Sequence, residues 1–188
     1  MNQEVFDDVQ RRLRPGIMAP ESTTGIHWFL YGLARLTQPR RIVEVGTCKG
    51  DATIYLVRAA VDNGRGSVRG YEVDPEKADA TRAKVAAAFG DGAPYEQMGG
   101  FPYDASSPVE ADLAFIDVDP KTDYGRALDG ISLSVGGYVC AHDLTYPPSR
   151  AHVEAFHEQL LESGRYEAIA VQQERGLTVA RKTAGGNL

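Results

Sequence analysis

The spacing of apolar residues along the chain changes repeatedly between two patterns. Short, nearly continuous or alternating apolar runs predict strands, and apolar residues three or four positions apart predict helices. The stretch RRIVEV is apolar at most positions, as in a parallel strand that is covered on both faces. One predicted helix has a proline in its first turn, where the missing N–H costs nothing. The predicted strands are 40–45, 67–74, 95–98, 111–118 and 138–143, and the predicted helices are 5–13, 22–36, 51–62, 75–89, 124–135 and 149–163.

The last two apolar segments predict a hairpin rather than another crossover. Segments 166–172 and 177–182 flank the sequence QERG, whose polar residues and glycine favour a turn. Repeated alternation of strand and helix predicts a parallel sheet with helices on both faces, to which the hairpin adds an antiparallel strand. We therefore expect an α/β, doubly wound sheet of seven strands in a single domain, 1–188, with N-terminal helices in 1–38 and the α/β core in 39–183.

Composition and charge exclude several classes of function. Hydrophobic residues make up 43% of the chain and charged residues 24%, which is ordinary for a globular protein. A net charge of −6 disfavours nucleic-acid partners, because phosphate binding needs clustered Lys and Arg. No apolar stretch approaches the roughly 20 residues of a membrane span. Cys48 and Cys140 lack metal-ligand spacing, and with no signal-like start they indicate a cytoplasmic location.

The turn after the first predicted strand has the composition of a ligand-binding turn. Glu44 ends the apolar run, and Gly46 and Gly50 follow in the sequence VEVGTCKGDAT. Glycines let the backbone approach a ligand closely, and the next helix offers unpaired N–H groups. The dinucleotide fingerprint needs three glycines, and Thr47 stands where the second belongs. This departure disfavours an NAD-dependent oxidoreductase, and Glu44 suits a cationic ligand better than a diphosphate.

The second strand of this region ends in another carboxylate. Glu72, in YEVDP, stands where a carboxylate can accept hydrogen bonds from the two hydroxyls of a ribose. Together with Glu44 it favours an adenosyl ligand that carries an amino acid. The structural alternative is that Glu72 and Asp74 only cap the next helix.

Acidic residues and a histidine follow the two later strands. FIDVDPKTDY contains Asp117 and Asp119, and CAHDLTY contains His142 and Asp143. Because neighbouring parallel strands end at the same edge, these side chains are expected to converge. One use is a divalent cation: carboxylates suit magnesium, whereas imidazole suits zinc, iron or nickel. Another is general base catalysis by His142, oriented by an aspartate. The structural alternative is that they form turns and helix caps.

Four motifs in this order resemble one enzyme family. VEVGTCKGDAT, YEVDPEKADATRAKV, DLAFIDVDPKTDY and GGYVCAHDLTY are similar to the motifs of class I S-adenosylmethionine (SAM)-dependent methyltransferases. The likeness is greatest to the small-molecule O-methyltransferases of the catechol and caffeoyl-CoA type and their bacterial relatives, and it runs from about Ile17 to Arg181. It implies a Rossmann-like methyltransferase fold, SAM as cofactor and methyl transfer to a hydroxyl oxygen of a small molecule.

The resemblance also assigns roles to residues. It places Asp117 near the sulfonium of the cofactor. It matches Asp117 and Asp143 to two metal-binding aspartates, with magnesium or another divalent ion assisting, but Leu144 replaces the family's asparagine and His142 precedes Asp143. The remaining cofactor assignments are Glu44, Gly46, Thr47 and Gly50 at the methionine part, Glu72 at the ribose, and Val73, Met98, Gly99 and Phe101 at the adenine.

Several questions stay open at this stage. Lys121 and Tyr124 resemble a family pair but stand one residue late, and Tyr146 is placed either to reach the pocket or to lie on the surface. The N-terminal helices are expected to form part of the acceptor-site cover, with His27 and Trp28 either facing the acceptor or simply packed. A homodimer is compatible with so short a chain. Two alternative functions are metal-dependent hydroxylation or cyclisation on the same fold, and a non-catalytic partner subunit that binds the cofactor.

Overall fold

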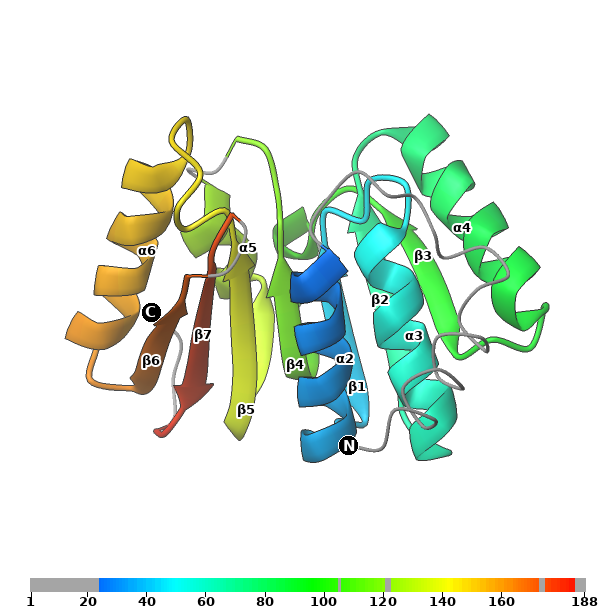
Figure 1. The fold of residues 1–188 in the computed structure, drawn as a ribbon, viewed down its shortest axis with the longest axis horizontal. Coiled ribbons are helices and arrows are strands. Elements are labelled where there is room, and N and C mark those ends of the chain that lie inside the picture. Colours follow the sequence, from blue (N-terminus) through cyan, green and yellow to red (C-terminus); the bar gives the residue numbers. More distant parts are fainter. Residues whose placement is uncertain (1–23, 105, 121–122, 173–174, 185–188) are drawn as a thin grey trace.

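The structure, a computed structural model, describes residues 24–104, 106–120, 123–172 and 175–184. A single seven-stranded sheet in the order β3-β2-β1-β4-β5-β7-β6 runs through it (Figure 1). Strands β1 to β5 pair in parallel, and β7 pairs antiparallel with both β5 and β6, which confirms the predicted α/β fold and closing hairpin. The strands are β1 Arg41–Val45, β2 Ser67–Glu72, β3 Tyr95–Gly99, β4 Val109–Ile116, β5 Ile131–His142, β6 Tyr166–Val171 and β7 Leu177–Lys182.

Helices lie on both faces of the sheet (Figure 1). Apolar side chains of α2, α3 and α4 pack with one face in a cluster that includes Ile42 and Phe115. Side chains of α5 and α6 pack with the other face in a cluster that includes Val43 and Ile116. The alternation of Ile42 and Val43 between the two clusters explains why the strand is apolar at nearly every position. The helices are α2 Thr24–Thr37, α3 Asp51–Asn63, α4 Pro75–Phe89, α5 Tyr124–Asp129, α6 Arg150–Glu162 and the 3-10 turn η1 Pro102–Asp104.

Local sequence fixes the start of α4 as expected. The Asp74 carboxylate accepts the backbone N–H groups of Glu76 and Lys77, and Pro75 occupies the first turn. The helix predicted at 5–13 lies outside the described residues. No helix in the described ranges combines the length and the apolar character needed to cross a bilayer.

One predicted element is wrong. We expected a helix over 124–135, but α5 ends at Asp129 and the chain enters β5 at Ile131. In this segment Ile131 and Leu133 are buried and Ser132 is exposed, which is the two-residue period of a strand. Ile131–Leu133 pairs with Val109–Ala111 of β4, and after a register shift Tyr138 pairs with Leu113. The glycines expected to end a helix instead lie inside β5, where the register shifts.

Candidate functional site

The turn between β1 and α3 brings the first strand close to the end of β4. The N–H of Gly46 donates to the carbonyl of Tyr71 at 2.9 Å, and Gly46 has a φ of +92°. A Cβ on Gly46 would lie 2.1 Å from the backbone oxygen of Asp117, so no other residue fits without a shift of the backbone. Gly50 begins α3 at a φ of +79°. The glycines therefore permit close approach between segments of this chain, while their contact with a ligand stays a prediction.

Glu72 holds this turn from the side of β2. Its Oε2 accepts the N–H of Cys48 at 2.8 Å, and its Oε1 accepts the N–H of Asp74 at 3.1 Å. Because Asp74 caps α4, the structure separates the two roles that the sequence left open for Glu72 and Asp74. Each carboxylate oxygen has two lone pairs, so Glu72 keeps acceptor capacity for a ligand.

A hollow of about 140 Å³ lies at this edge of the sheet. Five residues that the sequence predicted as cofactor contacts line it: Gly46, Glu72, Val73, Phe101 and Asp117. Four of the other lining residues were not identified from the sequence as site residues, namely Cys48, Tyr71, Lys77 and Val118. Asp119 also lines the hollow, and the sequence had predicted it in the acidic cluster at the strand ends rather than as a cofactor contact. For Cys48 the signal was present, because it stands inside the glycine turn.

Five predicted cofactor residues are not among those that line the hollow, and one of them, Met98, instead lines the larger hollow described below. Thr47 is buried, and its hydroxyl lies 3.3 Å from Oε1 of Gln97. Gly50 faces Thr81 of α4. Glu44 and Gly99 likewise do not line it, and Glu44 is 1% exposed. Their contacts with a cofactor stay predictions.

Glu44 lies in an environment that opposes its charge. Burial raises the pKa of its carboxyl to about 8, with Asp117 and Glu72 adding to the shift and the hydroxyl of Thr53 opposing it. Its Oε2 is buried and has no hydrogen-bond partner among the described residues. A buried carboxyl with one unsatisfied oxygen beside the glycine turn would suit a cationic group that arrives with a ligand.

At the ends of β4 and β5, a histidine lies between two aspartates. His142 Nδ1 is 3.0 Å from Oδ2 of Asp117 and 3.5 Å from Oδ1 of Asp143. Because a carboxylate only accepts, Nδ1 carries the proton, and in the neutral ring Nε2 is the acceptor. Nε2 is buried and lacks a hydrogen-bond partner among the described residues. Of the four side chains expected to converge, those of Asp117, His142 and Asp143 do so, whereas Asp119 lines the neighbouring hollow.

Asp143 contacts an arginine that no motif in the sequence identifies. Arg175, from the turn between β6 and β7, places Nε 2.6 Å from Oδ1 and Nη2 2.9 Å from Oδ2 of Asp143. The guanidinium also lies 3.8 Å from the centroid of the Tyr146 ring. The contact of Nε with Oδ1 is an ion pair, and that of Nη2 with Oδ2 is also a hydrogen bond. The Asp143 side chain is 2% exposed, so the pair is largely shielded from water on the aspartate side.

These contacts test whether the cluster fits the metal implied by the family resemblance. Ligand atoms of Asp117, His142 and Asp143 lie within 4.8 Å of one another, which is close enough for a shared ion. However, Arg175 donates from Nη2 to Oδ2 of Asp143 and lies within ion-pair distance of Oδ1, and Leu144 offers no ligand atom at the asparagine position. The guanidinium already supplies a positive charge there. We conclude that this set of donors does not fit a magnesium ion.

Other residues singled out in the sequence have structural contacts. The Tyr124 hydroxyl donates to the carbonyl of His142 at 3.0 Å, and the ring is 1% exposed. His27 and Trp28 pack against Tyr55 of α3, with ring centroids 5.4 and 5.2 Å away, which supports the packing interpretation. Lys121 lies outside the described residues.

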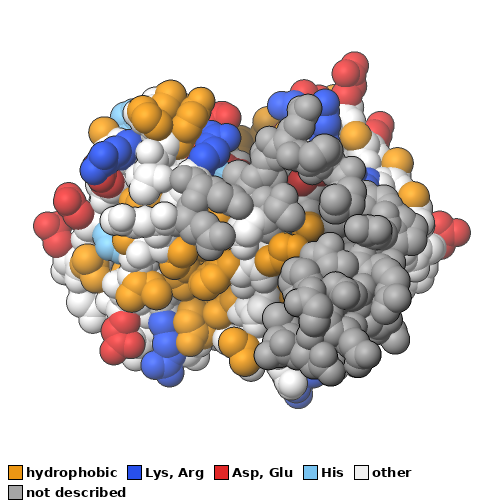
Figure 2. Space-filling model, in the orientation of Figure 1, with side chains coloured by type: hydrophobic (Ala, Val, Ile, Leu, Met, Phe, Trp, Pro, Cys, Tyr) orange, Lys and Arg blue, Asp and Glu red, His pale blue; other side chains and the backbone are white. Residues whose placement is uncertain are grey.

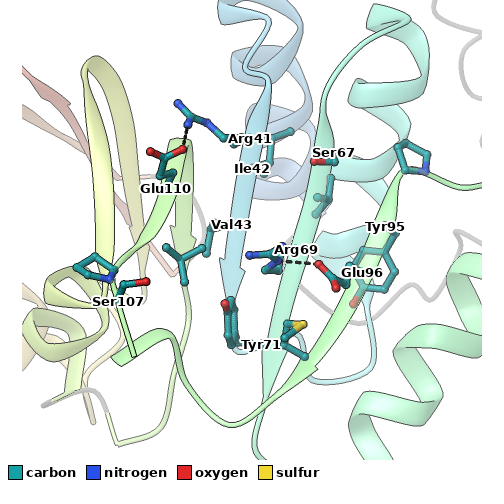
Figure 3. A pocket seen from close by; sticks show the side chains of 15 residues that line it. Arg41, Ile42, Val43, Ser67, Arg69, Tyr71, Tyr95, Glu96, Ser107 and Glu110 are labelled. Carbon is teal, nitrogen blue, oxygen red and sulfur yellow. Dashed lines mark hydrogen bonds and ion pairs between the residues drawn. The ribbon is translucent and has the colours of Figure 1, made fainter. Parts of the chain in front are cut away.

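A larger hollow, of about 630 Å³, lies elsewhere on the sheet (Figure 3). Arg41 pairs with Glu110, and Arg69 donates from Nε to Glu96 at 2.8 Å across it. Arg41, Ser67 and Tyr95 begin their strands, so much of this hollow lies toward the opposite end of the strands. Its charged groups neutralise one another in pairs, and it therefore lacks the unsatisfied polar atoms found at the first site.

Comparisons with known proteins agree with this architecture. No protein-family model matches the sequence, and no curated protein matches it either. Among solved structures, an O-methyltransferase from Bacillus cereus in complex with S-adenosylhomocysteine (SAH) is 20% identical and has a TM-score of 0.73. The match covers 97% of this chain and 92% of the Bacillus cereus protein. The O-methyltransferase TomG from Streptomyces achromogenes, involved in tomaymycin synthesis and in complex with SAM, is 23% identical and has a TM-score of 0.73. The match covers 98% of this chain and 92% of TomG. An SAH-bound methyltransferase from Podospora anserina is 18% identical and has a TM-score of 0.72. The match covers 98% of this chain and 97% of that protein. The chain therefore has the fold of these methyltransferases.

Proposed function

We propose that this protein is a SAM-dependent methyltransferase that acts on a small molecule, at a hydroxyl oxygen. The observation that carries the proposal is the site geometry. The Glu72 hollow and the Asp117–His142 pair share one edge of the sheet, with Asp117 belonging to both. In open α/β sheets, ligands bind beyond the carboxyl ends of the strands. The solved structures bound to SAM or SAH that share the fold support the same cofactor.

The lining of the hollow fits an adenosyl cofactor. Glu72 would accept hydrogen bonds from the ribose hydroxyls, and Val73 and Phe101 would pack beside the adenine. Gly46 would let the backbone approach the methionine part, above the buried carboxyl of Glu44. When bound, SAM supplies a methyl group activated by its sulfonium.

The histidine pair supplies the acid–base chemistry of the proposal. Asp117 would hold the Nδ1 proton of His142, leaving Nε2 to accept the proton of an acceptor hydroxyl. Tyr124 would support this by binding the His142 carbonyl. Alignment and desolvation of the acceptor oxygen would provide much of the remaining rate enhancement.

The proposal includes a cover over the acceptor site and a second copy of the chain. Residues 1–38 would contribute part of the acceptor-site cover within a single domain, 1–188.

Figure 2 shows apolar side chains gathered over β5 and β7, and Ile169 on β6 is 62% exposed. Such a patch favours a homodimer. Cys48 and Cys140 are unpaired, which favours a reducing, cytoplasmic setting.

Titration of the full chain with S-adenosylhomocysteine tests the cofactor. We expect binding by wild type that Glu72→Ala weakens by about tenfold or more, because charged acceptors contribute about 1.5–3 kcal/mol per hydrogen bond. Glu76→Ala, an exposed carboxylate of α4, is the matched control and should bind as wild type does. Failure of wild type to bind would refute the proposal and favour other chemistry on the same fold. Binding without methyl transfer to any phenol or catechol would favour a partner-subunit role.

A further inference from the structure

The antiparallel pairing of β7 with β5 places Arg175 beside Asp143, which follows the end of β5. Because β7 runs antiparallel to β5, with Leu177 opposite His142, the β6–β7 turn lies beside the residues that follow β5. The N–H of Thr145 donates to the carbonyl of Arg175 at 2.8 Å, which ties the two loops together. A Cβ on Gly176 would lie 2.8 Å from the Thr145 nitrogen, so this close approach needs a glycine.

The arginine is held in a fixed place by three contacts. Its Nε and Nη2 lie 2.6 and 2.9 Å from the two oxygens of Asp143, and its guanidinium stacks on Tyr146. Of these contacts, Nη2 to Oδ2 is a hydrogen bond and Nε to Oδ1 is an ion-pair contact. A planar guanidinium can make both while stacking on an aromatic ring, which lysine does not reproduce. A rigid positive charge therefore lies next to the aspartate pair that flanks His142.

We propose that Arg175 replaces a divalent cation in this site. Its guanidinium holds Asp143 and supplies the positive charge that would otherwise come from a metal shared by Asp117 and Asp143. The inference rests on the proposed function, since it assigns Arg175 as a positioning residue of the same acceptor site. It follows that the acceptor need not chelate a metal, and a single hydroxyl group is sufficient.

Manganese binding by the full chain tests this replacement directly. Titration of Mn²⁺, followed by electron paramagnetic resonance in saturating S-adenosylhomocysteine, compares wild type with Arg175→Met. We expect only weak, millimolar binding by wild type. We expect about tenfold or tighter binding by Arg175→Met, because one repelling charge is removed and two carboxylate oxygens are released. Adding Asp143→Asn to this variant should abolish the gain. Arg150→Met, which removes an exposed arginine paired with Glu154, is the control and should behave as wild type.

Several results would overturn the proposal. One is micromolar Mn²⁺ binding by wild type that Asp143→Asn removes. Another is wild-type methyl transfer that EDTA abolishes and magnesium restores. A third is an Arg175→Met variant that binds Mn²⁺ no better than Arg150→Met. Arg175→Gln provides a second variant of similar polarity if the methionine variant does not fold. Cofactor titration of the same samples reports separately on the proposed function.

Discussion

Replacing Glu44 by glutamine should stabilise the protein at alkaline pH. The Glu44 carboxyl is 1% exposed, and burial raises its pKa from an ordinary 4.5 to about 8. Between these values the native protein holds a proton that the unfolded chain has released. Stability from this group is therefore present below pH 4.5 and is lost as pH rises to about 8. At about 1.4 kcal/mol per pH unit, the free energy of unfolding should fall by about 5 kcal/mol across this window.

Urea unfolding of the full chain without cofactor measures this effect. The difference between Glu44→Gln and wild type should be small near pH 5 and reach several kcal/mol in favour of the variant near pH 9. Taking the difference cancels other titrating groups. The control is Glu76→Gln, the same substitution at an exposed position on α4. A wild-type-minus-Glu44→Gln difference that varies by less than about 1 kcal/mol would contradict the assigned environment of Glu44.

Two further substitutions test the turn and the histidine. Gly46→Ala should lower the free energy of unfolding by about 2–4 kcal/mol and weaken S-adenosylhomocysteine binding, since its Cβ would lie 2.1 Å from the Asp117 oxygen. Gly92→Ala, which meets nothing within 4 Å, should leave both unchanged and serves as the control in urea unfolding and titration. His142→Gln should reduce methyl transfer to a phenolic acceptor by about 10²-fold or more while preserving cofactor affinity. Equal loss of binding and rate would instead indicate a structural role.

Elements with a strong local pattern could be predicted from the sequence. The RRIVEV strand and the helix capped by Asp74 depend on burial and capping that neighbouring residues already specify. The segment 131–135 could not be assigned in this way. Ile131 and Leu133 fit a helix that continues from α5 as well as a strand, and only pairing with Val109–Ala111 of β4 decides between them. That pairing is a long-range interaction that local propensity does not contain.

In the candidate site, too, residues with a local sequence signal could be predicted, whereas a residue placed by long-range strand pairing could not. Gly46 and Glu72 are local features of a strand end, and the sequence predicted both as ligand contacts. Arg175 is separated from Asp143 by 32 residues and lies in a turn. From the sequence alone, a charged residue in a turn is expected to be a solvent-exposed surface residue. Its role emerges only when antiparallel pairing of β5 with β7 sets Leu177 opposite His142. Magnesium does not fit this site because a competing cation, Arg175, lies outside the motif.

Glu44 and Glu72 illustrate how similar positions acquire different roles. Both are buried carboxylates at the ends of neighbouring parallel strands, and both precede a turn. Glu72 accepts two backbone N–H groups and lines the hollow, so it can bind ligand hydroxyls as a preorganised acceptor. Glu44 lies outside that lining with an unsatisfied oxygen. Its ionisation therefore depends on a positive charge reaching it, and a cofactor ammonium would provide one. The first carboxylate is ready to bind without a ligand, whereas the second becomes favourable only when one arrives.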